Sequence, residues 1–255
     1  MDKYCVIGSP IDHSLSPKIH NRLFDYYGLS ARYSKIDVSF ENLEKVLKKL
    51  KKEGYKGFNV TYPLKGEILN LIDEHPDYVK TISSVNTVSI VNGKLIGDNT
   101  DFRGMQFILA PYKNEKIYIL GSGNMANTTL YALNESGQKV TVACRNATAG
   151  ESLRYRYPYI ELMSLDQFSK QKLKGVTINT LPLDLDISYL FDNKNDHTVI
   201  DCNYNTSPSL NSKIKYISGL SLLYAQALKS FEIWTGHSPT MKILDSLMRT
   251  NGNKH

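Results

Sequence analysis

The sequence of 255 residues predicts an α/β fold with two domains that face each other across a cleft. Segments of strand and helix character alternate along both halves of the chain, which is typical of α/β proteins. A glycine-rich turn of the kind that joins a strand to a helix occurs in the second half, at residues 121–126. No long linker, tandem repeat or low-complexity tract separates the halves, so we expect them to be packed as neighbouring domains.

The first hundred residues alternate between predicted strands and helices. Strands are predicted where apolar and β-branched residues precede turn residues, and helices where apolar residues recur every three or four positions. Asn92 and Gly93 mark the turn of a hairpin. The predicted elements are a strand at 4–10, a helix at 17–28, a strand at 31–38, a helix at 41–52, a strand at 57–63, a helix at 65–72 and a hairpin at 85–101.

A second α/β unit follows the hairpin. A helix at 104–112 links the two halves, and the helix after the glycine turn has Ala126, Leu130 and Leu133 on one face. Two later strand-like runs, at 175–182 and 197–204, suit a parallel sheet. The other predicted elements are strands at 116–120, 139–144, 175–182 and 197–204, and helices at 219–236 and 239–249.

The composition is that of a globular protein, with 41% hydrophobic and 22% charged residues. No apolar run approaches the roughly 20 residues that span a bilayer, and the N-terminal apolar run is too short for a signal peptide. We therefore expect a cytoplasmic protein. Cys5, Cys144 and Cys202 form no CxxC pair, so neither a disulfide framework nor a metal site is expected, and Cys5 and Cys202 fit buried strand positions.

The formal net charge of +6 raises the possibility of a nucleic-acid binder. The basic residues are scattered, however, and the densest cluster, at 48–57, falls on the polar face of an amphipathic helix pattern. The 17 tyrosines form no stripe with the basic residues. The charge therefore favours anionic small molecules over nucleic acid.

The pattern Gly121-x-Gly123-x-x-Ala126 lies between a predicted strand and a predicted helix. The first glycine permits a tight turn, the second lets a pyrophosphate approach the backbone, and the small alanine lets the helix pack against the sheet. Free N–H groups at the helix N-terminus then hold the phosphates. The alternative is a plain glycine-rich turn. Because all three requirements are met in the right context, a dinucleotide site is favoured.

The second strand of this unit ends in Arg145 rather than in an acidic residue. An aspartate there holds the ribose of NAD, whereas an arginine pairs with the 2′-phosphate of NADP. We therefore predict NADP, with Asn146 and Thr148 as further hydrogen-bonding groups for this phosphate. The alternative is an arginine that is merely exposed to solvent.

Two strand-like runs end on single ionisable side chains, "GFNVTYPLK" on Lys65 and "GDNTD" on Asp101. They are either ordinary surface charges or the two parts of one proton-transfer site. Ser14 and Ser16 precede a helix that begins with a proline, and a capping role for Ser16 is the simplest interpretation.

Seven motifs, taken in their order along the chain, closely resemble those of the shikimate dehydrogenase family. They are "GSPIDHSLSP", "GFNVTYPLK", "SVNT", "GDNTDFRG", "GSGNMA", "DCNY" and "LLYAQALKSFEIWTG". The resemblance covers nearly the whole chain and is loose over 150–195. It implies NADPH-dependent reduction of 3-dehydroshikimate to shikimate, in the biosynthesis of aromatic amino acids. It also implies a substrate domain at 1–103, joined by returning helices at about 224–255, and a Rossmann-like NADP domain at 104–223.

The resemblance further implies which residues form the site. Lys65 is then the catalytic lysine and Asp101 its partner; Ser14, Ser16 and Tyr204 bind the substrate carboxylate; and Thr61, Asn86 and Gln226 bind ring hydroxyls together with the Lys65–Asp101 pair. We expect the cofactor to contact Gly121, Ser122, Gly123, Asn124, Met125, Ala126, Arg145, Asn146, Gly219 and Leu222. Asn124, Met125, Cys144 and Leu222 depart from the residues that are common in the family.

The chemistry of such a reaction suits these side chains. Hydride transfer to a ketone creates a developing alkoxide, which needs a proton donor, and a lysine in a desolvated cleft supplies one. The alternatives are a quinate/shikimate dehydrogenase with relaxed substrate or NAD use, and a non-catalytic NADP-binding sensor. The presence of both Lys65 and Asp101 argues against the sensor. The sequence leaves open whether the protein is a monomer or a homodimer.

Overall fold

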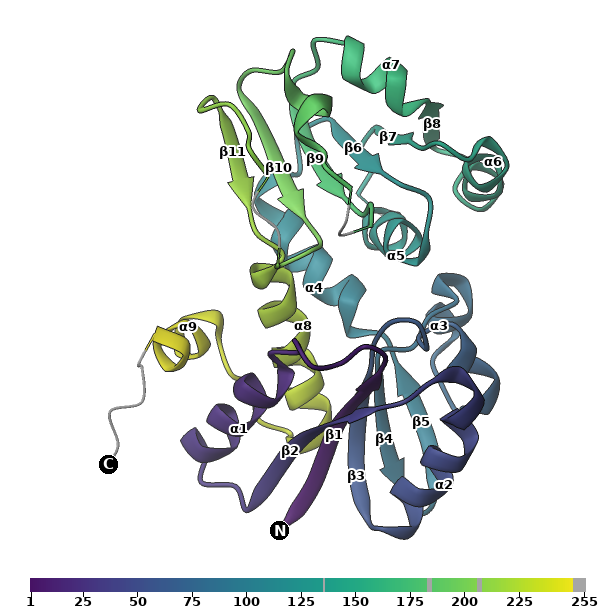
Figure 1. Ribbon diagram of the computed structural model, residues 1–255, viewed down its shortest axis with the longest axis vertical. Coiled ribbons are helices and arrows are strands. Elements are labelled where there is room, and N and C mark those ends of the chain that lie inside the picture. Colours follow the sequence, from purple (N-terminus) through teal and green to yellow (C-terminus); the bar gives the residue numbers. More distant parts are fainter. Residues whose placement is uncertain (135, 183–184, 206–207, 250–255) are drawn as a thin grey trace. The chain divides into compact units, whose positions relative to one another are not determined.

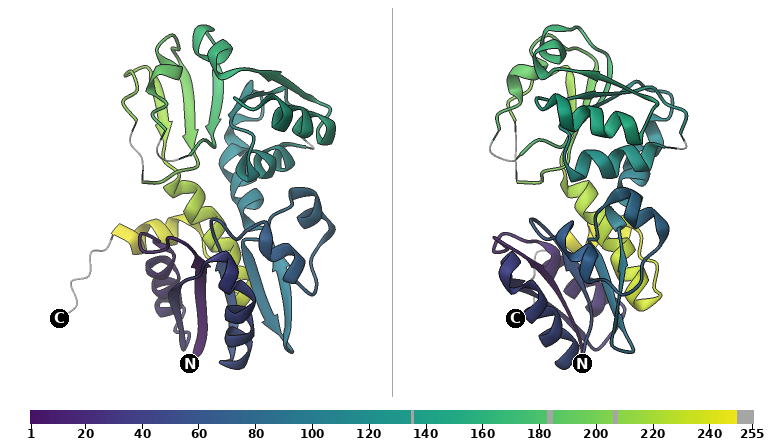
Figure 2. Two further views of the ribbon diagram at one scale, coloured as in Figure 1. Left: turned by 45° about the vertical axis from the view of Figure 1, so that its right-hand side comes forward. Right: turned by 90° about the vertical axis from the view of Figure 1, so that its right-hand side faces the viewer.

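The computed structural model describes residues 1–134, 136–182, 185–205 and 208–249 (Figure 1). The chain divides into two compact units. Unit 1 comprises Met1–Gly104 and Tyr224–His255, and unit 2 comprises Met105–Leu223. Within the described residues, no helix has the length and apolar character required to cross a membrane. Each unit contains one β-sheet with helices packed against it (Figure 2).

The sheet of unit 1 has five strands in the order β2-β1-β3-β4-β5. β1, β2 and β3 are parallel, whereas β4 pairs antiparallel with both β3 and β5. The turn of the β4–β5 hairpin places Asn92 and Gly93 at positive φ, the conformation that this residue pair favours. The strands are β1 (Asp2–Gly8), β2 (Ala31–Asp37), β3 (Tyr55–Val60), β4 (Thr87–Val91) and β5 (Lys94–Asp98).

Helices cover both faces of this sheet. On one face, Leu43, Leu47 and Leu50 of α2 pack with apolar residues of β1 and β3. On the other face, Tyr4 of β1 packs against Phe24 and Trp234 at ring distances of 5.2 and 5.1 Å. The helices of unit 1 are α1 (Ser16–Tyr26), α2 (Leu43–Lys52), α3 (Asp77–Ile82), the part of α8 (Leu220–Thr235) from Tyr224, α9 (Met241–Arg249) and the short 3₁₀ helices η1 (Phe40–Asn42) and η2 (Glu67–Leu71).

The sheet of unit 2 has six parallel strands in the order β11-β10-β9-β6-β7-β8. Counted from the first strand of the unit, this is the order 3-2-1-4-5-6 of a dinucleotide-binding Rossmann fold. The strands are β6 (Ile117–Leu120), β7 (Val140–Ala143), β8 (Ile160–Met163), β9 (Gly175–Asn179), β10 (His197–Asp201) and β11 (Ile214–Ile217).

Both faces of this sheet are buried, as expected for parallel strands. Ile117 and Ile119 of β6 join one apolar cluster, and Tyr118 and Leu120 join the other, because successive strand residues point to opposite faces. The helices of unit 2 are the part of α4 (Thr100–Leu109) from Met105, α5 (Asn124–Leu133), α6 (Ala147–Arg156), α7 (Leu165–Lys170) and the 3₁₀ helices η3 (Ala110–Tyr112) and η4 (Ser188–Phe191).

The prediction of an α/β protein with a Rossmann-like second domain is confirmed. Several helices and strands, however, were predicted with wrong bounds or were not predicted at all. The helix predicted at 65–72 is only the 3₁₀ helix η2, because the main-chain oxygen of Lys65 accepts from Val85 N–H at 2.8 Å instead of a helical partner. The helix predicted from residue 104 begins at Thr100. The prediction had no element at α3, α6, β8, α7 or β11.

Candidate active site

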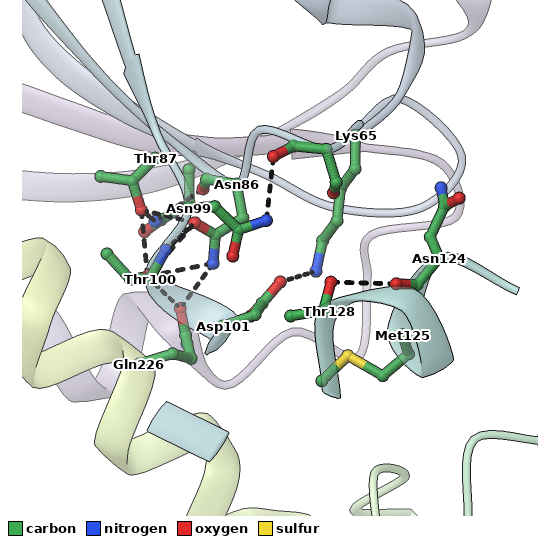
Figure 3. A network of polar contacts seen from close by, with 12 residues as sticks. Lys65, Asn86, Thr87, Asn99, Thr100, Asp101, Asn124, Met125, Thr128 and Gln226 are labelled. Atoms are coloured by element: carbon green, nitrogen blue, oxygen red, sulfur yellow. Dashed lines mark hydrogen bonds and ion pairs between the residues drawn. The ribbon is translucent and has the colours of Figure 1, made fainter. Parts of the chain in front are cut away.

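Lys65 and Asp101 form an ion pair in unit 1. Lys65 Nζ lies 2.7 Å from Asp101 Oδ2, and their side chains are 26% and 9% exposed. Figure 3 shows the amine and the carboxylate pointing at each other. A partly buried ammonium group that is oriented by a carboxylate can give a proton to an oxygen that develops negative charge. The two residues therefore form one ion pair rather than two separate surface charges.

Local structure fixes both members of this pair. A turn after β3, closed by Leu64 N–H donating to Thr61 O at 2.9 Å, brings Lys65 out of the strand. Asp101 lies in the first turn of α4, where a carboxylate is favoured by the helix dipole. Asn99 begins this helix: its Oδ1 accepts from Phe102 N–H at 3.2 Å. A cap at Asn99 explains why the helix begins before residue 104.

Asn86 and Gln226 meet, although 140 residues separate them in the sequence. Asn86 Nδ2 donates to Gln226 Oε1 at 3.4 Å and to Thr100 Oγ1 at 3.0 Å. Thr100 N–H in turn donates to Asn86 Oδ1 at 2.7 Å, so this end of the carboxamide is an acceptor. The structure thus brings together Asn86, Asp101 and Gln226 through Thr100, the neighbour of Asp101 (Figure 3).

Thr61 and Ser14 lie on the loops that follow β3 and β1, and Ser16 is the first residue of α1. Thr61 N–H donates to Ile7 O at 2.9 Å, and Gly8 allows this close approach because a Cβ there would lie 2.7 Å from Tyr62 O. Ser16 is not a helix cap: Leu15 is the cap residue of α1, and Ser16 N–H donates to Ser14 Oγ at 3.3 Å. The simplest interpretation of Ser16 was therefore wrong.

A buried polar network behind these residues was missed by the sequence analysis. Its members are Tyr33, Asn59, Thr87, Thr100 and Ser230, all under 9% exposed. Ser230 Oγ lies 2.8 Å from Thr87 Oγ1 and 3.1 Å from Thr100 Oγ1. The available signal was the polar residue in each of the apolar strand runs "GFNV" and "NTVSIV", since a buried amide or hydroxyl needs partners.

The glycine turn of unit 2 has the geometry that the sequence pattern requires. Gly121 has φ +105°, and a Cβ there would lie 2.7 Å from Thr180 Oγ1. Gly123 precedes α5, whose first helical hydrogen bond runs from Asn127 N–H to Gly123 O at 3.0 Å. The N–H groups of Asn124, Met125 and Ala126 therefore lie at the helix N-terminus, which is suited to a phosphate. Ser122 precedes this turn's second glycine and hydrogen bonds to Cys144.

Arg145 and its neighbours follow β7 and begin α6. Arg145, Asn146 and Thr148 are exposed. Asn146 caps α6, because its Oδ1 accepts from Ala149 N–H at 3.1 Å. The carboxamide of Asn146 retains its NH₂ group as a donor, so capping and phosphate binding are compatible. Burial raises the pKa of the neighbouring Cys144, so this thiol is in its neutral form at ordinary pH.

The other predicted contacts of unit 2 differ in exposure. Leu222 is only 5% exposed and belongs to the apolar core. Gly219 lies against the main chain of Asn203, where a Cβ would be 2.7 Å away. Tyr204 is half-buried and follows β10, so it is in unit 2, whereas the other predicted substrate residues are in unit 1. Cys202, expected to be buried, is half-buried, whereas Cys5 is fully buried.

The described residues contain no group of three or more His, Cys, Asp or Glu side chains arranged to hold a metal ion. The Lys65–Asp101 pair is the acid–base group of the candidate site in unit 1. The candidate cofactor contacts in unit 2 are those of a nucleotide, since they combine a glycine turn, a helix N-terminus and an exposed arginine.

Taken together, an α/β substrate unit with a lysine–aspartate pair and a Rossmann-type unit define the class of two-domain dinucleotide-dependent dehydrogenases. The sequence model of the shikimate dehydrogenase substrate binding domain matches residues 6–88. The NADP-dependent shikimate dehydrogenase of Aquifex aeolicus is 34% identical over 246 residues, which is 91% of each chain. That of Methanococcus maripaludis is 34% identical and covers 94% of this chain and 93% of its own. The chain belongs to the shikimate dehydrogenase family.

Comparison with solved structures gives the same family. The crystal structure of shikimate dehydrogenase from Aquifex aeolicus matches with a TM-score of 0.88 at 33% identity and covers 98% of both chains. Shikimate 5-dehydrogenase from Thermus thermophilus, in complex with NADP(H) and shikimate, matches with a TM-score of 0.85 at 26% identity and covers 98% of this chain and 99% of its own. The predicted family is therefore confirmed.

Proposed function

We propose that this protein catalyses the reversible, NADPH-dependent reduction of 3-dehydroshikimate to shikimate. The observation that carries the proposal is the Lys65–Asp101 pair, 2.7 Å apart, in a unit that holds several further short polar side chains. Family membership supports the same activity, because relatives that cover more than nine-tenths of the chain are NADP-dependent shikimate dehydrogenases. At the level of the family, the predicted reaction, enzyme class and cofactor are confirmed.

Lys65 acts as the proton donor and acceptor in this proposal. Bound NADPH supplies a hydride to the ketone carbon. Lys65 Nζ gives a proton to the oxygen that develops negative charge, and it takes the proton back in the direction of oxidation. Asp101 orients the amine and keeps it near the reacting oxygen, since its Oδ2 accepts one of the three N–H groups and leaves two.

The remaining unit 1 residues bind the substrate. Shikimate is small, anionic and rich in hydroxyls, so it needs many short hydrogen-bonding side chains. We assign the carboxylate to Ser14 and Ser16, and the ring hydroxyls to Thr61, Asn86 and Gln226. The hydrogen bonds that Gln226 Oε1 accepts from Asn86 and Thr100 support this, because they hold the Gln226 carboxamide beside Asn86.

Unit 2 holds the cofactor. The N–H groups at the start of α5 would hold the pyrophosphate, and the Gly121 turn would let it approach the backbone. Arg145, with Asn146 and Thr148, would hold the 2′-phosphate, and Gly219 and Leu222 would contact the nicotinamide half of the cofactor. Because Leu222 is a core residue, its part is to shape the wall of the site rather than to make polar contacts.

The relatives do not favour the alternative with relaxed substrate or NAD use, since those from Aquifex aeolicus and Methanococcus maripaludis are NADP-dependent shikimate dehydrogenases. A cytoplasmic location and a monomeric or homodimeric state remain predictions. Gel filtration combined with light scattering distinguishes a monomer from a homodimer.

The test is the initial rate of NADP and NAD reduction by the purified protein, with shikimate and with quinate, at mildly alkaline pH. Fast turnover with shikimate and NADP alone is the expected result. Comparable rates with quinate or NAD would support the broader dehydrogenase activity. No turnover with either acid would contradict the proposed reaction and the role of Lys65, while the fold assignment would stand.

A further inference from the structure

A buried tyrosine hydroxyl lies behind the proposed substrate residues of unit 1. Tyr33 is in β2 and is only 2% exposed. Its hydroxyl donates to Asn59 Oδ1 at 2.7 Å. The sequence motif "GFNVTYPLK" contains Asn59, but neither the proposed reaction nor the assigned substrate contacts give Tyr33 or Asn59 a role. Any role for this pair rests on the proposed function, because the pair would act on how that substrate site is held.

The orientation of the Asn59 carboxamide is determined from both of its ends. Asn59 Nδ2 lies 3.0 Å from the main-chain oxygen of Asn86, which can only accept a hydrogen bond. The NH₂ group must therefore face Asn86, and the carbonyl oxygen must face Tyr33. Tyr33 is consequently the donor in its contact with Asn59.

The same carboxamide also holds the side chain of Asn86 indirectly. Asn59 Nδ2 lies 3.1 Å from Thr87 Oγ1, and this hydroxyl donates to Asn86 Oδ1 at 3.0 Å. Asn86 is thus held at its main-chain oxygen by Asn59 directly, and at its side-chain oxygen by Thr87, whose hydroxyl accepts a hydrogen bond from Asn59. Figure 3 shows Thr87 beside Asn86.

Tyr33 is suited to hold Asn59 in one orientation. Burial raises the pKa of Tyr33 well above its usual value, so the phenol keeps its proton at any pH at which the enzyme works. The ring stacks on His20 with 4.4 Å between centroids, which fixes the direction of the hydroxyl.

We propose that Tyr33 is a positioning residue for substrate binding, whose hydroxyl orients the Asn59 carboxamide and through it holds Asn86 against the ring hydroxyls of the substrate. Tyr33 itself touches neither the substrate nor the reacting atoms. Its removal should therefore weaken substrate binding equally in the ground state and the transition state, and leave proton transfer by Lys65 intact.

The test is Tyr33→Phe, which keeps the ring and its stacking on His20 and removes only the hydroxyl. The matched control is Tyr4→Phe, a buried tyrosine of the neighbouring strand β1 that is paired with Tyr33 in the sheet and packs on Phe24 and Trp234. The loss of one buried hydrogen bond corresponds to a factor of about five to ten. We expect the KM for shikimate to rise about five- to tenfold in Tyr33→Phe, with kcat and the KM for NADP within about twofold of wild type.

Thermal unfolding separates this effect from a purely structural one. A structural role alone would lower the melting temperature and the active fraction, and so reduce kcat at an unchanged KM. A KM for shikimate within twofold of the wild-type value in an active Tyr33→Phe enzyme overturns the proposal and leaves the proposed function standing. An inactive wild type overturns both.

A double-mutant cycle with Asn59→Ser tests whether Tyr33 acts through Asn59. If Tyr33 acts through Asn59, Tyr33→Phe should change the KM for shikimate by less than about twofold in the Asn59→Ser background. The full five- to tenfold effect in that background would overturn the route through Asn59. Should Tyr33→Phe fail to fold, Asn59→Ser alone carries the test, since an unchanged KM there contradicts any positioning role for this pair.

Discussion

The two units of the chain build their candidate sites from different parts of the polypeptide. In unit 1 the site is made of side chains that are mostly buried and hydrogen bonded to one another, such as Asn86, Thr100 and Asp101. In unit 2 the main chain supplies the candidate site, through the Gly121 turn and the N-terminus of α5, and the charged side chain assigned to it, that of Arg145, is exposed.

This difference matches the demands of the two proposed ligands. A small polyol acid is distinguished by the exact positions of its hydroxyls, so its site needs side chains whose orientation is fixed in advance. A pyrophosphate is the same in NAD and NADP, and main-chain N–H groups recognise it without any particular side chain. Substitutions in unit 1 should therefore impair turnover and substrate binding, whereas those in unit 2 should alter cofactor preference and stability.

The largest effect is expected for Lys65→Ala. Removal of the proton donor should lower kcat about a thousandfold, within the range that general acid–base catalysis contributes. Steady-state kinetics give kcat, and calorimetric titration with shikimate should show an affinity that is nearly unchanged. Lys51→Ala is the matched control, because Lys51 also pairs with a carboxylate, that of Asp73 at 3.4 Å, but on the surface of unit 1. A Lys65→Ala enzyme with full turnover would remove Lys65 from the mechanism.

The second test concerns the core of unit 2. Burial, followed by the charge of Lys194, lowers the pKa of His197 from 6.5 to about 4. Between these values the unfolded chain binds a proton that the folded chain does not, so the free energy of unfolding falls as the pH is lowered from 6.5 towards 4. At pH 5 the loss is about 2 kcal/mol, at 1.36 kcal/mol per pH unit.

Urea unfolding at pH 7 and pH 5 measures this loss. His197→Gln cannot titrate and can still hydrogen bond to Thr177, whose Oγ1 lies 2.7 Å from His197 Nε2. This variant should lose less stability than wild type between the two pH values. Equal losses in wild type and His197→Gln would show that other groups cause the acid sensitivity.

A buried histidine of unit 1 should have a similar effect. Burial lowers the pKa of His20 to about 3, so unit 1 should also lose stability as the pH is lowered over a similar range.

The same contrast between the units explains what could be predicted from the sequence. The turn at Gly121 and Gly123 was predictable, because a strand, two glycines and a helix are contiguous and the requirement for positive φ is local. The contact between Asn86 and Gln226 follows only from the family resemblance, since 140 residues separate them and nothing local indicates that α8 packs behind β4.

Missed elements have a similar explanation. α6 and α7 have short or weakly periodic apolar patterns, and their caps at Asn146 and Ser164 are single residues that many loops also contain. Tyr33, Asn59 and Thr87 are ordinary strand residues one at a time, and their network becomes visible only when β2, β1, β3 and β4 are placed side by side. Local conformation was thus predictable where the signal is strong and contiguous, as at Gly121, whereas weakly patterned helices and contacts across the sheet were not.

A smaller effect is expected for Arg145→Ala. Loss of a charge-assisted contact with the 2′-phosphate should raise the KM for NADP about tenfold and leave the KM for NAD within about twofold. Arg154→Ala is the control, because Arg154 is a similarly exposed arginine of α6 whose partner is Glu151 at 2.7 Å. Equal changes in the KM for NADP and NAD would show that Arg145 does not recognise the phosphate.

The smallest effect is expected for Asn146→Ala, which separates the two roles of this side chain. Loss of the cap on α6 should lower the free energy of unfolding by about 1 kcal/mol. Ser164→Ala removes the corresponding cap of α7, where Ser164 Oγ accepts from Gln167 N–H at 3.0 Å, and should destabilise the protein by a similar amount without changing the KM for NADP. Urea unfolding and NADP kinetics on both variants make the comparison. If Asn146 also binds the 2′-phosphate, only Asn146→Ala should raise the KM for NADP; if the two variants have the same KM, Asn146 is a helix cap alone and Arg145 recognises the phosphate without it.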